Sequence, residues 1–283
     1  MGSLVSVIVP TRNSARTLEA CLVSIRAQEY TPLELIVVDN HSSDATPDIA
    51  RRHADKVDAF GPERSAQRNH GAEVANGAYL LFIDSDMTLA PRVVGDCVSS
   101  IDLTGAPGVV IPETTVGDNF LARCRALERS CYLGDVSIEA ARFFPRQEFE
   151  RVGGYDETLT GMEDWDLSIR IAAGRQLARS ESHISHDEGD LRLGPMLGKK
   201  RYYAAGSLNY WGKHGGSNPS AANIVLRPAF FRNWRRLVRH PILTAGFMSV
   251  KTLEAGAGAL GLVESWANHR FSHGSSPRRT ETK

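Results

Sequence analysis

The chain has 283 residues, of which 42% are hydrophobic and 23% charged, a composition typical of one large globular domain with a smaller extension. The formal net charge is zero, but residues 192–283 hold 15 basic and 3 acidic side chains, which leaves 18 basic and 30 acidic ones in residues 1–191. The acidic part suits a metal site and the basic part suits an anionic membrane or another polyanionic partner, and we expect no nucleic-acid partner.

The cysteines and the first ten residues indicate the cellular compartment of the protein. The four cysteines form no C-x-x-C pair and have no metal-finger spacing, so we expect reduced, mostly buried thiols. Residues 1–10 predict a strand rather than a signal peptide, because no charged segment precedes an apolar one. We therefore expect a cytoplasmic protein.

Strand and helix patterns alternate at the start of the chain. Short runs rich in β-branched residues end in polar loops, and the segments that follow repeat their apolar residues at helical spacing. In order, we expect a strand over 4–9, a helix from 18 with Ser14 as its N-cap, a strand over 33–38, a helix over 45–53 with Pro47 in its first turn, a strand over 57–59, a helix over 65–75 and a strand over 79–83. This alternation predicts a parallel sheet with right-handed crossovers.

The middle of the chain is less regular. Paired glycines permit a backbone that other residues resist, and carboxylates suit the first turn of a helix. We expect a helix from Pro91, a short strand over 109–111, an irregular region over 117–149, a turn at Gly153-Gly154 and a helix from Glu163.

Two carboxylates follow the predicted strand over residues 79–83. Asp84 and Asp86 are one residue apart, with Ser85 between them. Ligands of an open α/β sheet bind beyond the carboxyl ends of its strands, so these side chains would meet a substrate rather than the core. Hard oxygen ligands in this position suit Mg²⁺ or Mn²⁺. The alternative is that Asp-Ser-Asp only forms a turn.

The first two predicted loops are polar and also lie at strand carboxyl ends. Thr11 and the amides of a helix start can meet a diphosphate, and Asp39 can accept a hydrogen bond from a base or a ribose. Asn13 is a further candidate for donor binding. It can equally act only as a helix cap, as can Ser43 and Asp44.

Two arginines stand just before the predicted central strand. Arg68 can pair with phosphate oxygens of a donor, and Arg64 lies one helical turn before it. The alternative for both is a solvated helix face.

Three carboxylates begin the helix after Gly161. The helix dipole alone would favour them there, but Glu163, Asp164 and Asp166 exceed what a cap requires. One carboxylate turned away from the helix axis can act as a general base toward a bound hydroxyl. Downstream, His186 can join two aspartates on one divalent ion, although a single histidine is more often a hydrogen-bonded core residue.

Five motifs in order resemble family 2 of the nucleotide-sugar glycosyltransferases. They are VSVIVPTRN, LELIVVDNHSSDAT, YLLFIDSD, RVGGYDE and GMEDWDLSIRI, and they span roughly residues 4–190. The resemblance implies a GT-A fold, which is a Rossmann-like, mostly parallel α/β sheet flanked by helices. It implies that residues 1–190 bind a nucleotide sugar and catalyse its transfer.

The resemblance also implies roles for individual residues. The matching positions are Pro10, Thr11 and Asp39 for the nucleotide, Asp84 for ribose and metal, Asp86 for the metal at the diphosphate, Asp164 (with Glu163 as runner-up) for the catalytic base, and His186 for the metal. We add Asn13, Arg68 and Ser85 to the predicted donor site. The implied cofactor is Mn²⁺ or Mg²⁺.

The activity implied is inverting, metal-dependent transfer of a sugar from a nucleoside diphosphate, with a UDP-sugar as first choice. The acceptor would be a hydroxyl of a lipid-linked or glycan molecule in cell-surface polysaccharide or glycoconjugate synthesis. The Q-x-x-R-W motif of processive synthases is absent, so we expect single additions. A homo-oligomer is left open.

Two other functions stay open at this point. A catalytically silent protein with the same fold could bind nucleotide sugars or act as a scaffold, although the intact Asp84-Ser-Asp86 and Glu163-Asp164 pairs speak against it. A sugar nucleotidyltransferase would need a glycine-rich, basic loop near the first strand, and PTRNSART is not one.

Residues 191–270 predict a basic, helical extension. From Pro228 we expect one helix with arginines around an apolar side made of Phe230, Phe231, Trp234, Leu237 and Val238. This pattern is typical of a helix that lies in a membrane interface, and packing against the catalytic domain is the alternative.

Residues 241–263 are apolar apart from Lys251 and Glu254. Each charge costs roughly 2.5–3.5 kcal/mol at a bilayer centre, so we expect a monotopic or protein-packed hairpin rather than a transmembrane helix. We therefore expect peripheral contact with the inner face of the plasma membrane through residues 228–263. Residues 271–283 predict a disordered tail.

Overall fold

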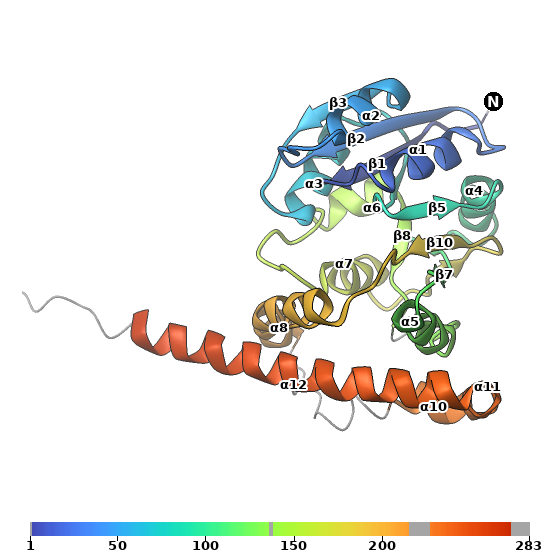
Figure 1. Cartoon of the computed structure of the whole chain (residues 1–283). Coiled ribbons are helices and arrows are strands. Elements are labelled where there is room, and N and C mark those ends of the chain that lie inside the picture. Colours follow the sequence, from blue (N-terminus) through green and yellow to red (C-terminus); the bar gives the residue numbers. More distant parts are fainter. Residues whose placement is uncertain (1, 136–137, 215–226, 273–283) are drawn as a thin grey trace, which may run out of the picture.

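The structure is a computed structural model that describes residues 2–135, 138–214 and 227–272. Its main element is a seven-stranded sheet formed within these residues (Figure 1). The strands in spatial order are β3 (Lys56–Ala59), β2 (Leu33–Asp39), β1 (Val5–Thr11), β4 (Tyr79–Phe82), β8 (Ala141–Pro145), β6 (Val109–Val110) and β9 (Ala178–Arg179). The first four are parallel, and β8 runs antiparallel to both of its neighbours, so the sheet is mixed but mostly parallel.

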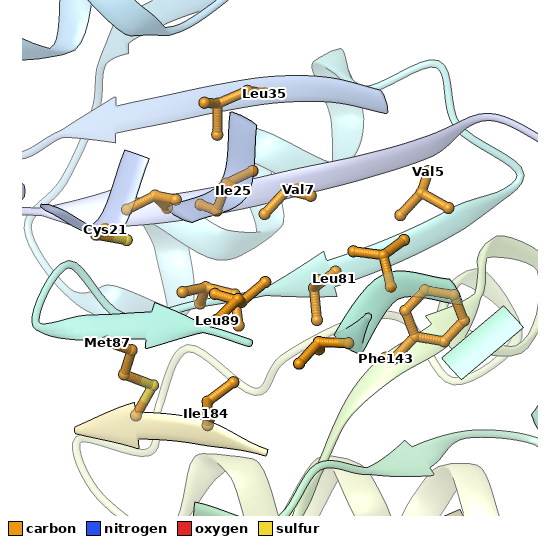
Figure 2. Packing of buried hydrophobic residues seen from close by; sticks show 14 of the residues in the cluster. Val5, Val7, Cys21, Ile25, Leu35, Leu81, Met87, Leu89, Phe143 and Ile184 are labelled. Atoms are coloured by element: carbon orange, nitrogen blue, oxygen red, sulfur yellow. The ribbon is translucent and has the colours of Figure 1, made fainter. Parts of the chain in front are cut away.

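Hydrophobic residues are buried on both faces of this sheet, as expected for strands covered by helices on each side. Val5, Val7 and Val9 belong to one core cluster, whereas Ile8 belongs to the other. Figure 2 shows part of the first cluster, in which Val7 and Leu81 lie near one another. The helices on that face are α1 (Leu18–Arg26), α2 (Thr46–His53) and α4 (Val93–Thr104), and those on the other are α3 (Arg64–Val74), α6 (Arg146–Arg151) and α7 (Glu163–Ala172).

A second, three-stranded sheet continues from the end of the first. Its central strand is β10 (Ile184–Asp187), which is antiparallel to β5 (Met87–Leu89) and parallel to β7 (Glu113–Val116). The register places His186 opposite Met87. Residues that are 99 positions apart in sequence are therefore brought to the same place just beyond the end of β4.

The predicted strands and helices up to residue 83 are present, with ends that differ by one or two residues. Two expectations were wrong. Ser14 is not the N-cap of α1, because Thr17 precedes the helix and the Ser14 hydroxyl donates to the carbonyl of Arg12. The region expected to be irregular contains the helix α5 (Phe120–Ser130) and the central strand β8.

The C-terminal part is helical, as predicted. It consists of α8 (Leu193–His214), α10 (Pro228–Arg232), α11 (Trp234–Arg239) and α12 (Pro241–Ser272). Helix α12 runs along the side of α5 and α8 that faces away from the main sheet (Figure 1). Residues 273–283 of the predicted tail lie outside the described residues. That residues 191–270 act as a separate unit stays a prediction.

The hairpin expected over residues 241–263 was wrong, because this stretch is part of the single helix α12. The two charges that argued against a membrane span are buried against α5 instead. Lys251 Nζ lies 2.8 Å from Glu128 and 3.3 Å from Glu254, and Arg125 pairs with both glutamates. None of the described helices combines the length and the apolar character that crossing a membrane requires.

The single apolar stripe expected from Pro228 is divided between two short helices. Phe230 is buried against Tyr132 and Phe247, and Leu237 packs on the same cluster. Phe231 and Trp234 instead point to solvent. Part of the stripe therefore packs against the rest of the protein, which was the alternative to membrane contact, and part of it stays exposed to solvent.

Candidate active site

The end of β4 turns sharply through the two predicted aspartates. The amide of Met87 donates to the carbonyl of Asp84 at 3.0 Å, which closes the turn. Strand β5 begins at Met87 and pairs with β10, so Asp86 lies beside His186 with 3.3 Å between Oδ2 and Nε2. The turn thus sends Asp86 toward the smaller sheet.

A buried arginine connects this turn to the start of α7. Nη2 of Arg68 lies 2.7 Å from Asp84, and Nη1 lies 2.9 Å from Asp164 and 3.3 Å from Glu163. The Arg68 side chain is fully buried, and its guanidinium lies 5.0 Å from the ring centroid of Tyr155. The solvated helix face considered for Arg68 is therefore wrong, while its contact with a donor phosphate stays a prediction.

The charges around Asp84 fix its ionisation. Burial alone would raise the pKa of Asp84, but Arg68, Arg142 and Arg64 outweigh it and hold the pKa well below its usual value. Arg142 comes from β8 and lies 3.5 Å from Asp84. Asp84 is therefore a carboxylate whose two oxygens face arginines.

The two carboxylates proposed for the base differ in access. Glu163 is buried, and one of its oxygens faces both Arg68 and Arg64. The Asp164 side chain is 24% exposed, and only its Oδ1 is hydrogen-bonded to Arg68. Oδ2 of Asp164 has no hydrogen bond to the described residues, which leaves it available to an incoming hydroxyl.

The third carboxylate of the cluster has a structural role. Asp166 is fully buried and pairs with Arg170 at 2.7 Å and with Lys213 and His214 at 2.8 Å. Burial would raise the pKa of Asp166, but hydrogen bonds to Lys213, Arg170 and His214 outweigh it and lower the pKa. The ion pairs of Asp166 with Lys213 and His214 therefore join the C-terminal end of α8 to α7.

The surroundings of Asp86 fit a divalent cation that is bound partly by the protein and partly by a substrate. Oδ1 of Asp86 is buried without a hydrogen-bond partner, and a carboxylate and an imidazole are both ligands that Mn²⁺ accepts. No three His, Cys, Asp or Glu side chains of the described residues converge as a complete metal site. Mg²⁺ is usually bound through one or two carboxylates and substrate phosphates, so a site with few protein ligands is compatible with it, and metal binding by Asp86 and His186 stays a prediction.

Arg129 and Glu113 lie on the Nδ1 side of the His186 ring, away from Asp86. Arg129 of α5 lies 2.8 Å from Nδ1, and Glu113 of β7 lies 3.9 Å from the same atom. Burial alone would lower the pKa of His186, but the nearby carboxylates of Asp86 and Glu113 outweigh it and raise the pKa. An arginine can only donate, so Nδ1 accepts from Arg129 and the proton on Nε2 faces Asp86; a metal bound at Nε2 would replace that proton.

The two early loops interlock beside the Asp84 turn. Parallel pairing sets Thr11 opposite Asp39, so both loops leave the sheet at the same edge. The Asp39 carboxylate accepts hydrogen bonds from the amide and hydroxyl of Ser42, at 2.9 and 2.5 Å. The amide of Asn13 donates to Ser42 Oγ at 2.7 Å, and the Asn13 side chain accepts from the amide of Ser43 at 2.9 Å.

Three other predicted donor-site residues lie along the same edge. Pro10 is buried within β1, and the buried Oγ1 of Thr11 has no hydrogen-bond partner. Ser85 donates from its hydroxyl to the Ser14 hydroxyl at 2.9 Å, which ties the Asp84 turn to the first loop. A buried hydroxyl without a partner fits a missing polar ligand, but the donor contacts of these residues stay predictions.

Sequence reasoning missed three members of the site. Glu113, Arg129 and Arg142 come from β7, α5 and β8, all in or beside the region expected to be irregular. Arg142 was detectable as a charge within the apolar run Ala141–Pro145. Nothing local in the sequence points to Glu113 or Arg129.

The sheet edge thus brings together the two polar loops, the Asp84-Ser85-Asp86 turn and the carboxylates at the start of α7, which is the arrangement that the resemblance to nucleotide-sugar glycosyltransferases implies. The family model of "Glycosyl transferase family 2" matches residues 6–160. The chain belongs to this family and is a glycosyltransferase. The sugar nucleotidyltransferase considered above is therefore wrong.

Named relatives agree with this assignment. A "PGL/p-HBAD biosynthesis glycosyltransferase" of Mycobacterium bovis is 30% identical over 192 residues, which cover 63% of this chain and 73% of the relative. "Glycosyltransferase AglE" of Haloferax volcanii is 36% identical over 110 residues, or 36% of each chain.

Solved structures confirm the GT-A-like fold. The mannosyltransferase PcManGT from Pyrobaculum calidifontis, in complex with GDP-Man and Mn²⁺, matches with a TM-score of 0.54 and 20% identity over 96% of this chain and 76% of that one. S. aureus TarS 1-349 in complex with UDP-GlcNAc matches with a TM-score of 0.52 and 16% identity over 97% and 93%. This chain covers 57% of a longer TarS chain.

Proposed function

We propose that the protein is a metal-dependent, inverting glycosyltransferase that moves a sugar from a nucleoside diphosphate, UDP first, to a hydroxyl of a lipid-linked or glycan acceptor. The product would belong to a cell-surface polysaccharide or glycoconjugate. The observation that carries this proposal is that one buried guanidinium, Arg68, holds the Asp84 turn and Asp164 together. The turn that carries the proposed metal ligand and the proposed catalytic base therefore lie in one site.

The residues of the chain account for the proposed steps. Asp86 and His186 would hold Mn²⁺ or Mg²⁺, which when bound stabilises negative charge on the leaving diphosphate. Asp164 would accept the proton of the acceptor hydroxyl at Oδ2, while Arg68 keeps Oδ1 in place. A single displacement from the face opposite the leaving group inverts the anomeric centre without an enzyme nucleophile, as in inverting glycosidases.

Thermal stabilisation by nucleotide sugars tests the donor and the metal together. A matching donor with Mn²⁺ at 100 times its Kd stabilises the protein by about 2.7 kcal/mol, or roughly 5–10 °C in Tm. We expect Asp86→Ala to abolish the part of this shift that depends on Mn²⁺, because Asp86 is the carboxylate with an unused buried oxygen. Asp164→Asn serves as the control and should keep the full shift.

Hydrolysis of the donor in the absence of acceptor tests the catalytically silent alternative. A transferase slowly hydrolyses its donor in the presence of metal when no acceptor is present, whereas a silent binding protein only binds it. A full metal-dependent shift in Asp86→Ala would remove Asp86 from the metal site.

We also propose that the protein works at a membrane surface. The support is a group of exposed apolar residues within residues 231–242, here called the apolar patch: the side chains of Phe231, Trp234, Val238 and Ile242 are 55–75% exposed. Arginines lie among them in α10 and α11, and Arg235 covers the ring of Trp234 at 5.8 Å. Exposed aromatic residues among arginines are typical of surfaces that insert between anionic lipid headgroups.

Vesicle binding tests this patch. We expect the double variant Phe231→Ser/Trp234→Ser to bind vesicles of phosphatidylcholine and phosphatidylglycerol at least tenfold more weakly, since each buried aromatic contributes roughly 1.5–3 kcal/mol. Leu103→Ser is the control, because Leu103 is 85% exposed on α4, outside the patch. Equal sedimentation of the double variant and the wild type with these vesicles would contradict the proposal.

A further inference from the structure

Arg64 is more exposed than the two arginines that pair with Asp84, which are Arg68 and Arg142. It is the first residue of α3, and its side chain is 42% exposed. Burial alone would lower the pKa of Arg64, but Asp84 and Glu163 outweigh it and raise the pKa, so its guanidinium feels the charges of both ends of the site. The family-like motifs do not include this position.

The two other arginines that face Asp84 are already paired with carboxylates. Arg68 is fully buried and faces Asp84, Asp164 and Glu163. The Arg142 side chain is 9% exposed and pairs with Glu113 at 2.8 Å as well as with Asp84. Arg68 therefore faces three carboxylates and Arg142 faces two.

Arg64, in contrast, is held weakly. Only Nη2 has partners, at 3.4 Å from Glu163 and 3.5 Å from the Tyr203 hydroxyl, and both distances exceed the 2.7–2.9 Å typical of charge-assisted hydrogen bonds. Nε and Nη1 donate to no atom of the described residues. A guanidinium offers two parallel N–H groups along its Nε–Nη2 edge or its Nη1–Nη2 edge, so an oxyanion on Arg64 would replace only the two long contacts of Nη2.

An aromatic residue of α8 keeps this arginine beside Glu163 and Asp164. The guanidinium lies 5.8 Å from the ring centroid of Tyr203. The ring packs on Gly161, where a Cβ atom would lie 3.4 Å from Tyr203 Cδ1. Gly161 is two residues from Glu163, so the C-terminal extension places Tyr203 and Arg64 directly next to the start of α7.

We propose that Arg64 binds a phosphate group of a substrate through Nη2 together with Nη1 or Nε. This inference depends on the proposed function, which supplies two sources of that chemistry. One is the diphosphate of the nucleotide donor, and the other is a phosphate that links the acceptor to its lipid. A planar guanidinium with two parallel N–H groups matches phosphate oxygens in either molecule.

Binding of inorganic pyrophosphate and of UDP, each with Mn²⁺ and without acceptor, is measured by calorimetry for the wild type, Arg64→Gln and Arg64→Lys. Arg92→Gln is the matched control, since Arg92 is an exposed arginine of a helical i,i+4 pair on the other face of the sheet. If the donor supplies the phosphate, Arg64→Gln weakens both ligands about tenfold or more. Arg64→Lys keeps the charge without the planar edge and should recover part of the affinity.

If the acceptor supplies the phosphate, binding of both ligands stays normal. The KM of Arg64→Gln then rises about tenfold for a phosphate-linked acceptor and stays unchanged for the same glycan without phosphate. Unchanged binding together with unchanged KM for both acceptors would overturn the inference. Pyrophosphate binding needs no sugar donor, so a wild type that transfers no sugar counts against the proposed function and not against this site.

Discussion

The Asp164→Asn variant is expected to lose sugar transfer by about 10²- to 10⁴-fold, the usual contribution of a general base. The amide oxygen of asparagine can still accept the hydrogen bond from Arg68 that Asp164 Oδ1 accepts at 2.9 Å. The fold and the donor site should therefore survive. What asparagine cannot do is take a proton from the acceptor hydroxyl at the position of Oδ2.

Initial transfer rates of Asp164→Asn and Glu163→Gln, each at saturating donor and acceptor, decide between the two carboxylates. We expect the smaller loss in Glu163→Gln, because Glu163 is buried and faces Arg64 and Arg68 rather than solvent. A normal rate in Asp164→Asn would mean that the base has been misplaced. If Glu163→Gln then shows the large loss, Glu163 is the base.

The strands and helices before residue 83 could be predicted because their signals are local. Each strand is a short apolar run that the sheet buries, and each helix repeats its apolar residues on one face. The register that sets Thr11 opposite Asp39 follows from parallel pairing. The meeting of the two early loops was therefore predictable, although their hydrogen bonds to Ser42 were not.

Strand β8 could not be predicted in the same way. Its sequence carries Arg142 among apolar residues, and a charge in a central strand is stable only when partners from elsewhere meet it. Those partners are Glu113 of β7 and Asp84 after β4. Because they come from distant segments, the local pattern looked irregular.

Lys251 and Glu254 illustrate the same difficulty in the C-terminal helix. Their charges correctly argued against a membrane span, but the sequence did not show what neutralises them. The structure brings Arg125 and Glu128 of α5 against them, so a long straight helix packs where a hairpin was expected. The charges in the sequence thus argued against a membrane span, but only the ion pairs with α5 explain why the segment is one packed helix.

Arg68 is the residue whose replacement should most damage the structure of the site. In Arg68→Met, the methionine side chain takes the place of the arginine but carries no charge, so it cannot neutralise Asp84, Asp164 and Glu163. Removing one partner of a buried ion pair typically costs about 3–5 kcal/mol, because the remaining charges stay buried. We expect the free energy of unfolding to fall by about this amount and the Tm by roughly 10 °C.

Urea denaturation of Arg68→Met, Arg68→Lys and Arg64→Met measures this effect. Arg64 lies on the same helix and also faces Glu163, but its side chain is 42% exposed, so Arg64→Met should cost less than about 1 kcal/mol. Arg68→Lys keeps a positive charge but cannot reach Asp84 and Asp164 with two separate nitrogens, so it should be more stable than Arg68→Met and still transfer sugar slowly. A midpoint of Arg68→Met equal to that of the wild type would show that these carboxylates are neutralised by other groups, and that Arg68 does not hold the two ends of the site together.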